Sequence, residues 1–186
     1  MAGESSVGLR LLRQAVEQGS AGGMFSLGLA YEHGRGVPQD DAQAVRWIRK
    51  AAAAGFPRAM YNLAFRLEAG RGVPQDVTQA VDFYRKAAKA GVVVSMTNLG
   101  ARLVQAGPAK QIEAVKWFRK AAAAGDARGM FYLGRCLVRG FGVPKNPAQG
   151  VGWYRKAEAA SKDPLQRRQV GSELEALLRR YPELRE

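Results

Sequence analysis

The chain contains very few of the residues that build metal sites and catalytic centres. Among its 186 residues there is one cysteine, Cys136, and one histidine, His33. A single cysteine excludes an internal disulfide and a cysteine-based zinc site, and a single histidine excludes a two-histidine metal site and argues against a histidine-based triad. No SxxK, HExxH or GxSxG pattern occurs. We therefore predict no catalytic residues, no metal and no cofactor, and hence no enzymatic activity.

These two residues also have structural interpretations. His33 directly precedes Gly34 and fits a solvated helix end. Cys136 falls within a predicted helix and fits a small packing residue, with a reactive thiol as the alternative.

Long apolar runs are absent as well. No stretch approaches the ~20 apolar residues that span a bilayer, so we expect no membrane insertion. The start, MAGESSVGLRLLRQAVEQG, lacks a basic head followed by an apolar stretch, so no signal peptide is visible. The expected compartment is the cytoplasm, with the periplasm or secretion as the alternative if a signal peptide has been removed.

Acidic residues are scarce relative to basic ones. The chain has 29 Lys and Arg against 16 Asp and Glu, which gives a net charge of +13. Such a charge favours acidic partners, namely a carboxylate-rich protein, nucleic acid or an anionic surface.

The sequence contains an internal repeat. Met24, Met60 and Met96 are spaced by 36 residues and Met130 follows after 34, each at the start of a related block. We expect one repeat domain over 1–186. Its parts are a half repeat at 5–23, repeats at 24–59, 60–95, 96–129 and 130–165, and a C-terminal capping helix at 166–186.

Each repeat has the pattern of two helices. Met60, Leu63, Ala64 and Leu67 follow the i, i+3, i+4, i+7 spacing of a buried helix face, and the second half of the repeat has a similar stripe. One aromatic position in the second helix recurs in every repeat and is expected to pack in the core; its occupants are Trp47, Phe83, Trp117 and Trp153.

The glycine-rich stretch GRGVPQD joins the two helices of the first two repeats. Gly34 and Gly70 fit left-handed helix caps, and Asp40 and Asp76 fit the N-caps of the following helices. A phosphate-binding loop would need a preceding strand and a Lys-Ser or Lys-Thr pair, and neither is present. The third repeat has a connection two residues shorter, for which we expect a tighter turn at Gly107.

The repeated signature LG…Y…GxGVPxD…AVxWxxKAAxxG closely resembles the Sel-one-like repeat (SLR) family, a relative of tetratricopeptide repeats. The resemblance covers residues 8 to 165. It implies an all-α fold, a right-handed superhelical α-solenoid of about four 36-residue helix-turn-helix repeats plus an N-terminal half repeat and a C-terminal capping helix. The first helices would line a concave face and the second helices a convex face. Members of the family mostly serve as adaptors and scaffolds in protein complexes.

The candidate partner-binding residues lie on the first helices. Asn62 with Arg66, and Asn98 with Arg102, are i, i+4 pairs that project from one helix face. An Asn amide and an Arg fork could hold a carboxylate through charge-assisted hydrogen bonds of about 1.5–3 kcal/mol each. Further candidates are the apolar contacts Tyr61, Phe65 and Tyr132, and Arg135, which extends the basic character. The alternative is that the Asn residues only satisfy backbone groups.

Basic pairs recur in the second helices, at 49–50, 85–86, 119–120 and 155–156. They fit a solvated convex face, and they would also allow nonspecific nucleic-acid binding. The favoured function is a non-enzymatic protein-protein interaction module that binds an acidic peptide or protein surface in its concave groove. The alternatives are a bacterial immunity-type protein that caps a partner, and nonspecific nucleic-acid or anion binding. A monomer is favoured, with a homodimer through the N-terminal half repeat as the alternative.

Overall fold

The structure, a computed structural model, describes residues 2–185, and it describes side chains from residue 8 onward. Helix accounts for 78% of the described residues and no strand occurs among them, which confirms the predicted all-α class. The elements are α1 (Ala2–Glu17), α2 (Ala21–His33), α3 (Asp41–Ala53), α4 (Pro57–Ala69), α5 (Val77–Lys89), α6 (Val93–Gln105), α7 (Pro108–Ala123), α8 (Ala127–Arg139), α9 (Pro147–Ala160), α10 (Pro164–Arg180) and the 3-10 helix η1 (Pro182–Leu184).

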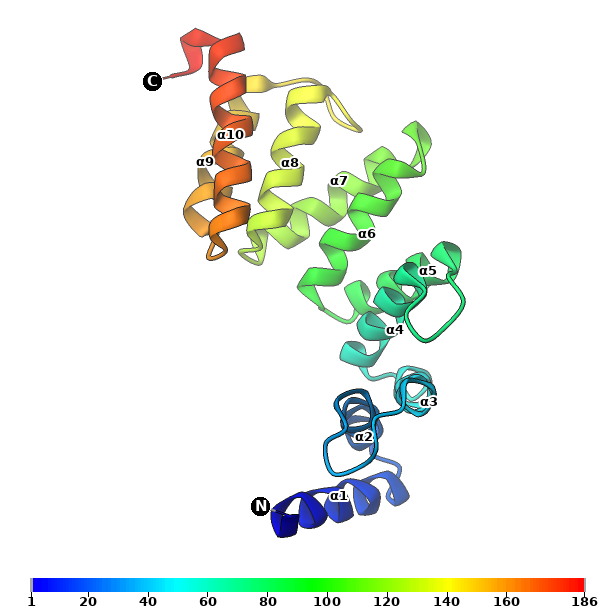
Figure 1. Ribbon diagram of the computed structural model, residues 1–186. Coiled ribbons are helices and arrows are strands. Elements are labelled where there is room, and N and C mark those ends of the chain that lie inside the picture. The colour runs from blue at the N-terminus through cyan, green and yellow to red at the C-terminus, as the bar shows by residue number, and fades with distance from the viewer. Residues whose placement is uncertain (1, 186) are drawn as a thin grey trace. The chain divides into compact units, whose positions relative to one another are not determined.

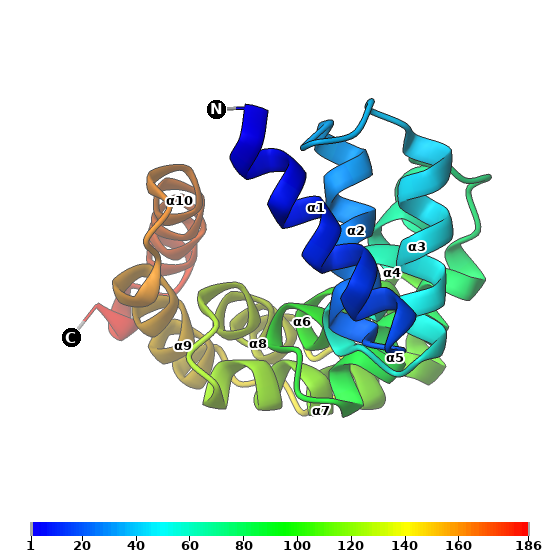
Figure 2. The ribbon, with the colours of Figure 1, turned by 90° about the horizontal axis from the view of Figure 1, so that it is seen from below.

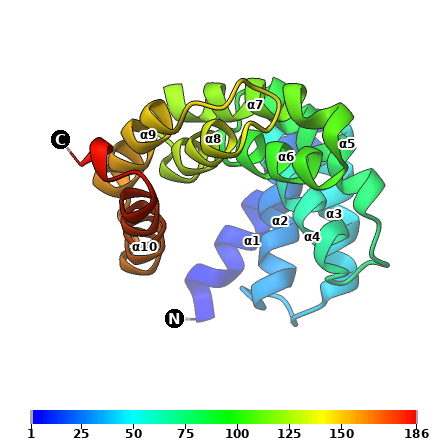
Figure 3. The ribbon, with the colours of Figure 1, turned by 90° about the horizontal axis from the view of Figure 1, so that it is seen from above.

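The helices form two compact units, Met1–Val92 and Val93–Glu186. In the first unit α2 pairs with α3 and α4 with α5; in the second α6 pairs with α7 and α8 with α9 (Figure 1). The single helix α1 packs on α2 (Figure 2), and α10 packs on α9 (Figure 3). Both units are therefore built from helix hairpins that stack on a neighbour, as expected for units that cannot bury an apolar face alone.

The glycine-rich loops act as helix caps. Gly34 and Gly70 adopt the left-handed conformation, with φ of 64° and 67°, and end α2 and α4. Asp40 and Asp76 then accept hydrogen bonds from the backbone N–H groups of Gln43 and Gln79 at 2.9 Å. Both cap predictions are confirmed, because the loop chemistry is local to a few consecutive residues.

The loops also allow close packing between repeats. A Cβ atom on Gly72 would lie 3.2 Å from Val45 of the preceding second helix, and one on Gly142 would lie 2.4 Å from the backbone carbonyl carbon of Gln111. The third connection is tighter, as predicted, because only Ala106 and Gly107 separate α6 from α7.

The recurring aromatic position is only partly buried. Trp117 is buried, but Trp47, Phe83 and Trp153 are half-buried. The prediction of core packing therefore holds fully for one of the four positions and in part for the other three. The C-terminal helix matches expectation, since Leu174 and Leu177 are buried in a cluster with Tyr154 and Leu178 packs against it.

Candidate partner-binding surface

Arg66 is the centre of a buried polar network in the first unit. The residue is 1% exposed on α4, and its Nη2 atom lies 2.7 Å from Oε2 of Glu32, which is 9% exposed at the end of α2. Its Nε atom donates to Oδ1 of Asn62 at 2.9 Å. Arg71 approaches the other oxygen of Glu32 at 3.3 Å. The network joins the first helices of two successive repeats.

This geometry corrects one sequence prediction. Asn62 and Arg66 do project together, as their i, i+4 spacing indicated, but Arg66 does not face a groove. Its charge is compensated inside the protein by Glu32, so a partner carboxylate would have to displace an existing buried ion pair. Arg66 is therefore removed from the set of partner-binding candidates.

The other two candidates on α4, Tyr61 and Phe65, differ in how far their side chains are exposed. The ring of Tyr61 is half-buried and lies 6.1 Å from the ring of Tyr84. Phe65 is 44% exposed, which makes it the more accessible of the two.

The remaining candidates lie in the second unit. Asn98 and Arg102 on α6 are half-buried, and Arg102 donates from Nη1 to Oε1 of Gln105 at 2.7 Å. Tyr132 on α8 stacks on Phe118 with ring centroids 5.1 Å apart and an interplanar angle of 16°. Stacking of this kind fixes the orientation of the Tyr132 ring.

Arg135 is held by contacts on both sides. Its guanidinium lies 5.7 Å from the ring centroid of Phe131, and its Nε atom lies 3.8 Å from Oε2 of Glu173 on α10. It remains half-buried, so part of the side chain is accessible.

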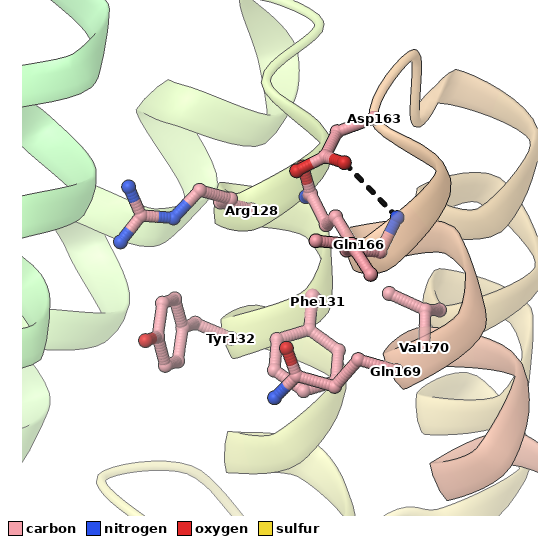
Figure 4. Close-up of a pocket in the computed structure, with 8 residues that line it drawn as sticks. Arg128, Phe131, Tyr132, Asp163, Gln166, Gln169 and Val170 are labelled. Atoms are coloured by element: carbon pink, nitrogen blue, oxygen red, sulfur yellow. Dashed lines mark hydrogen bonds between the residues drawn. The ribbon is translucent and has the colours of Figure 1, made fainter.

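A pocket of about 350 Å³ opens between α8 and α10, and we call it the α8–α10 pocket. Arg128 and Tyr132 project from α8 on one side, while Gln166 and Gln169 project from α10 (Figure 4). The apolar floor is formed by the buried residues Phe131 and Val170. The rim includes Leu165, which is 74% exposed, and Asp163, which accepts a hydrogen bond from the Leu165 N–H at 3.0 Å.

Polar groups of two kinds line the α8–α10 pocket, one shielded from solvent and the other accessible to a ligand. The Nε2 atom of Gln166 is buried and makes no hydrogen bond. Arg128 and Gln169 are exposed. A cation, an amide donor and a stacked aromatic ring therefore surround one opening, a combination that suits an acidic side chain next to an apolar one.

Of the pocket residues, the sequence prediction found only Tyr132. The sequence predicts α10 only as a terminal cap, and its buried residues Leu174 and Leu177 mark the face that packs on α9. Gln166 lies four residues before the apolar Val170, one helical turn away, and this spacing is the signal that could have placed it beside the core.

Comparison with protein families gives one match. Four copies of the Sel1 repeat are recognised, at residues 21–56, 57–92, 93–126 and 127–161. The chain belongs to the Sel1 repeat family. Sel1 repeat proteins are generally protein-interaction modules. No curated protein matches the chain at a significant level.

Solved structures of Sel1 repeat proteins have the same fold. A protective antigen of uropathogenic Escherichia coli with an SLR fold is 30% identical, with a TM-score of 0.75 over 93% of this chain. The chain spans only 44% of that antigen's length. A Sel1 repeat protein from Oxalobacter formigenes is 24% identical, with a TM-score of 0.76, and the match covers 88% of this chain and 76% of that one.

A weaker likeness connects the chain with an immunity protein from Pseudomonas aeruginosa. It is 22% identical, with a TM-score of 0.51, and the match covers 95% of this chain and 72% of that one. At this identity the likeness concerns the fold alone.

Each Sel1 repeat has a lysine stacked on the half-buried or buried aromatic residue of its second helix. The distances from Nζ to the ring centroid are 4.4 Å for Lys50 on Trp47, 5.1 Å for Lys86 on Phe83, 4.7 Å for Lys120 on Trp117 and 4.6 Å for Lys156 on Trp153. Cation–π contacts at exposed sites contribute about 0.5–1 kcal/mol each. The lysine of each recurring basic pair thus has a structural use that requires no ligand.

The lone cysteine of the fourth Sel1 repeat is a packing residue. Cys136 is 2% exposed, and its burial raises the pKa of the thiol to about 11, with Arg135 opposing the shift. Because the thiolate is the reactive form, the Cys136 thiol is protected at neutral pH. This supports the packing interpretation over the reactive one.

Among the described residues, no group of three or more His, Cys, Asp or Glu side chains could hold a metal ion. None of the described helices has the length and apolar character needed to cross a bilayer.

Proposed function

We propose that this Sel1 repeat protein is a non-enzymatic interaction module that binds an acidic segment of a partner protein, with the α8–α10 pocket as the main contact. The observation that carries the proposal is the pocket itself: the exposed side chains of Arg128 and Gln169 offer donors beside the stacked ring of Tyr132. This contact would be extended by three residues that the sequence predicts for partner binding and that belong to the same unit, namely Asn98, Arg102 and Arg135.

The physical argument rests on complementarity. Arg and Tyr are enriched among residues that dominate binding energy, because each combines apolar area with a directed polar group. A net charge of +13 speeds encounter with an acidic partner and disfavours basic ones. A segment with a carboxylate near Arg128 and an apolar side chain over Phe131 and Val170 would use both features.

The test is a selection from a peptide-display library against three forms of the protein. The forms are wild type, the double variant Arg128→Glu with Tyr132→Ala, and the control Arg119→Glu, which reverses a charge on the exposed side of α7. We expect wild type and the control to select the same acidic sequences and the double variant to lose them.

Two results would contradict the proposal. One is selection of the same peptides by the pocket variant and by wild type. The other is the absence of acidic enrichment in every form.

Nonspecific nucleic-acid binding is the second candidate, and the stacked lysines still leave positive charge on the second helices. It predicts binding that falls steeply with salt and is equal for Arg128→Glu and Arg119→Glu. The immunity-type role is a narrower form of the first proposal, and it would show as one high-affinity protein partner.

A further inference from the structure

A second pocket lies at the other end of the α8–α9 hairpin. Its volume is about 560 Å³, and it is an open pocket lined by the end of α8, the loop at residues 140–146, Tyr154 of α9 and the C-terminal half of α10. The apolar part of its lining includes Val138, Phe141, Leu177 and Tyr181. We call it the loop pocket.

Three cationic side chains from three separate segments line the loop pocket. Arg139 ends α8, Lys145 lies in the loop and Arg180 ends α10, and all three are exposed. The guanidinium carbons of Arg139 and Arg180 lie 5.9 Å and 5.7 Å from the ring centroids of Phe141 and Tyr181. Stacking restricts both arginines to the pocket rim.

The loop pocket has an excess of positive charge. Its one carboxylate, Glu173, accepts a hydrogen bond from the Tyr154 hydroxyl at 3.2 Å and lies 3.8 Å from Arg135. No ion pair of Arg139, Lys145 or Arg180 occurs within the part of the chain that the structure describes. Three like charges around one opening repel one another, and an anion between them would relieve that repulsion.

The charged and aromatic lining is special to the fourth repeat. The loop reads GFGVPKN here, whereas the first two repeats read GRGVPQD. Phe141 and Lys145 therefore replace Arg71 and Gln75 of the second repeat. In that repeat Gln75 donates to the backbone carbonyl of Glu68 at 2.8 Å, a capping role that needs no positive charge. Helix capping thus does not account for the lysine.

We propose that the loop pocket binds an organic anion, with a carboxylate between the basic side chains and an aromatic or branched apolar body against Phe141, Leu177 and Tyr181. The carboxylate takes charge-assisted hydrogen bonds from Arg139, Lys145 and Arg180. The apolar body of the ligand is removed from water when it packs against the aromatic lining. The site is separate from the α8–α10 pocket and does not depend on what binds there.

The test is an NMR titration of the full chain with N-acetylphenylalanine, its uncharged amide, inorganic phosphate, and an end-blocked peptide containing Phe followed by Asp. We expect N-acetylphenylalanine to shift the amide signals of residues 138–145 and 176–181, and to bind at least tenfold more tightly than the amide or phosphate. A response to the end-blocked peptide would indicate that an acidic side chain of a protein can supply the carboxylate. If only N-acetylphenylalanine shifts these signals, the ligand carries a terminal or free carboxylate.

The variant Lys145→Gln with Arg180→Gln should weaken N-acetylphenylalanine binding at least tenfold. The first two loops carry Gln at the position equivalent to Lys145, so the loop should keep its fold. Unchanged amide spectra away from the pocket would verify this. The control Arg119→Gln, on α7, should bind within twofold of wild type. Equal binding of the acid and its amide, equal binding of the double variant and wild type, or no shift at these residues up to the solubility limit would each overturn the proposal.

Discussion

The buried pair of Glu32 and Arg66 should behave as a coupled unit in stability measurements. Removing one partner of a buried ion pair leaves an uncompensated charge and typically costs about 3–5 kcal/mol. Replacing both partners by apolar residues of similar size is often close to neutral. The free energy of unfolding should therefore fall much more in the single variants than in the double variant.

The two single substitutions should also differ from each other. Glu32→Leu leaves the guanidinium of Arg66, a residue that is 1% exposed, without an anion, and we expect the free energy of unfolding to fall by about 3–5 kcal/mol. Arg66→Met leaves Glu32 with Arg71 at 3.3 Å, and the Arg71 side chain is 56% exposed. Arg71 can shift toward the carboxylate, so we expect a loss nearer to about 2–3 kcal/mol.

The assay is urea unfolding followed by circular dichroism for wild type, both single variants and the double variant. Arg46→Met, on the exposed side of α3, is the control for loss of one positive charge. Because a repeat array can unfold in parts, amide hydrogen exchange in α2 and α4 should locate the loss. Additive effects of the two substitutions, or a loss below about 1 kcal/mol for Glu32→Leu, would refute the buried-pair reasoning.

Three other outcomes are expected. Gly142→Ala should destabilise the protein by at least about 1 kcal/mol more than the control Gly55→Ala, as measured by thermal unfolding. Both glycines have a positive φ, but only a Cβ atom at position 142 would clash with backbone, at 2.4 Å. Asp126→Ala should lower the free energy of unfolding by about 1–2 kcal/mol, because the carboxylate accepts hydrogen bonds from the Gly129 N–H at 2.9 Å and from the Thr97 hydroxyl at 2.5 Å. Asp126→Asn should retain most of that stability in the same assay. The native Cys136 thiol should react slowly with a thiol reagent at pH 8 and quickly after unfolding. Because the folded state raises its pKa to about 11, stability should fall as pH rises from about 9 to about 11, and Cys136→Ala should reduce that fall.

The sequence by itself determined the helix pairs, their caps and the family. These features depend on residues a few positions apart, such as Gly34 ending one helix and Asp40 beginning the next, so no distant contact is needed to specify them. The repeat spacing then presents the same local signals four times, and the presence of only one cysteine and one histidine limits the chemistry open to the chain. The sequence also placed Asn62 and Arg66 on one helix face correctly.

The tertiary structure alone decided what those side chains contact. Arg66 is internal because Glu32, one repeat earlier, reaches it, and no periodicity within α4 indicates that partner. The α8–α10 pocket combines Arg128 with Gln166 from helices far apart in the chain, and the loop pocket combines Lys145 with Arg180 in the same way. Helical spacing fixes which side chains share a face, but burial and charge compensation depend on the neighbouring repeat that packs against that face.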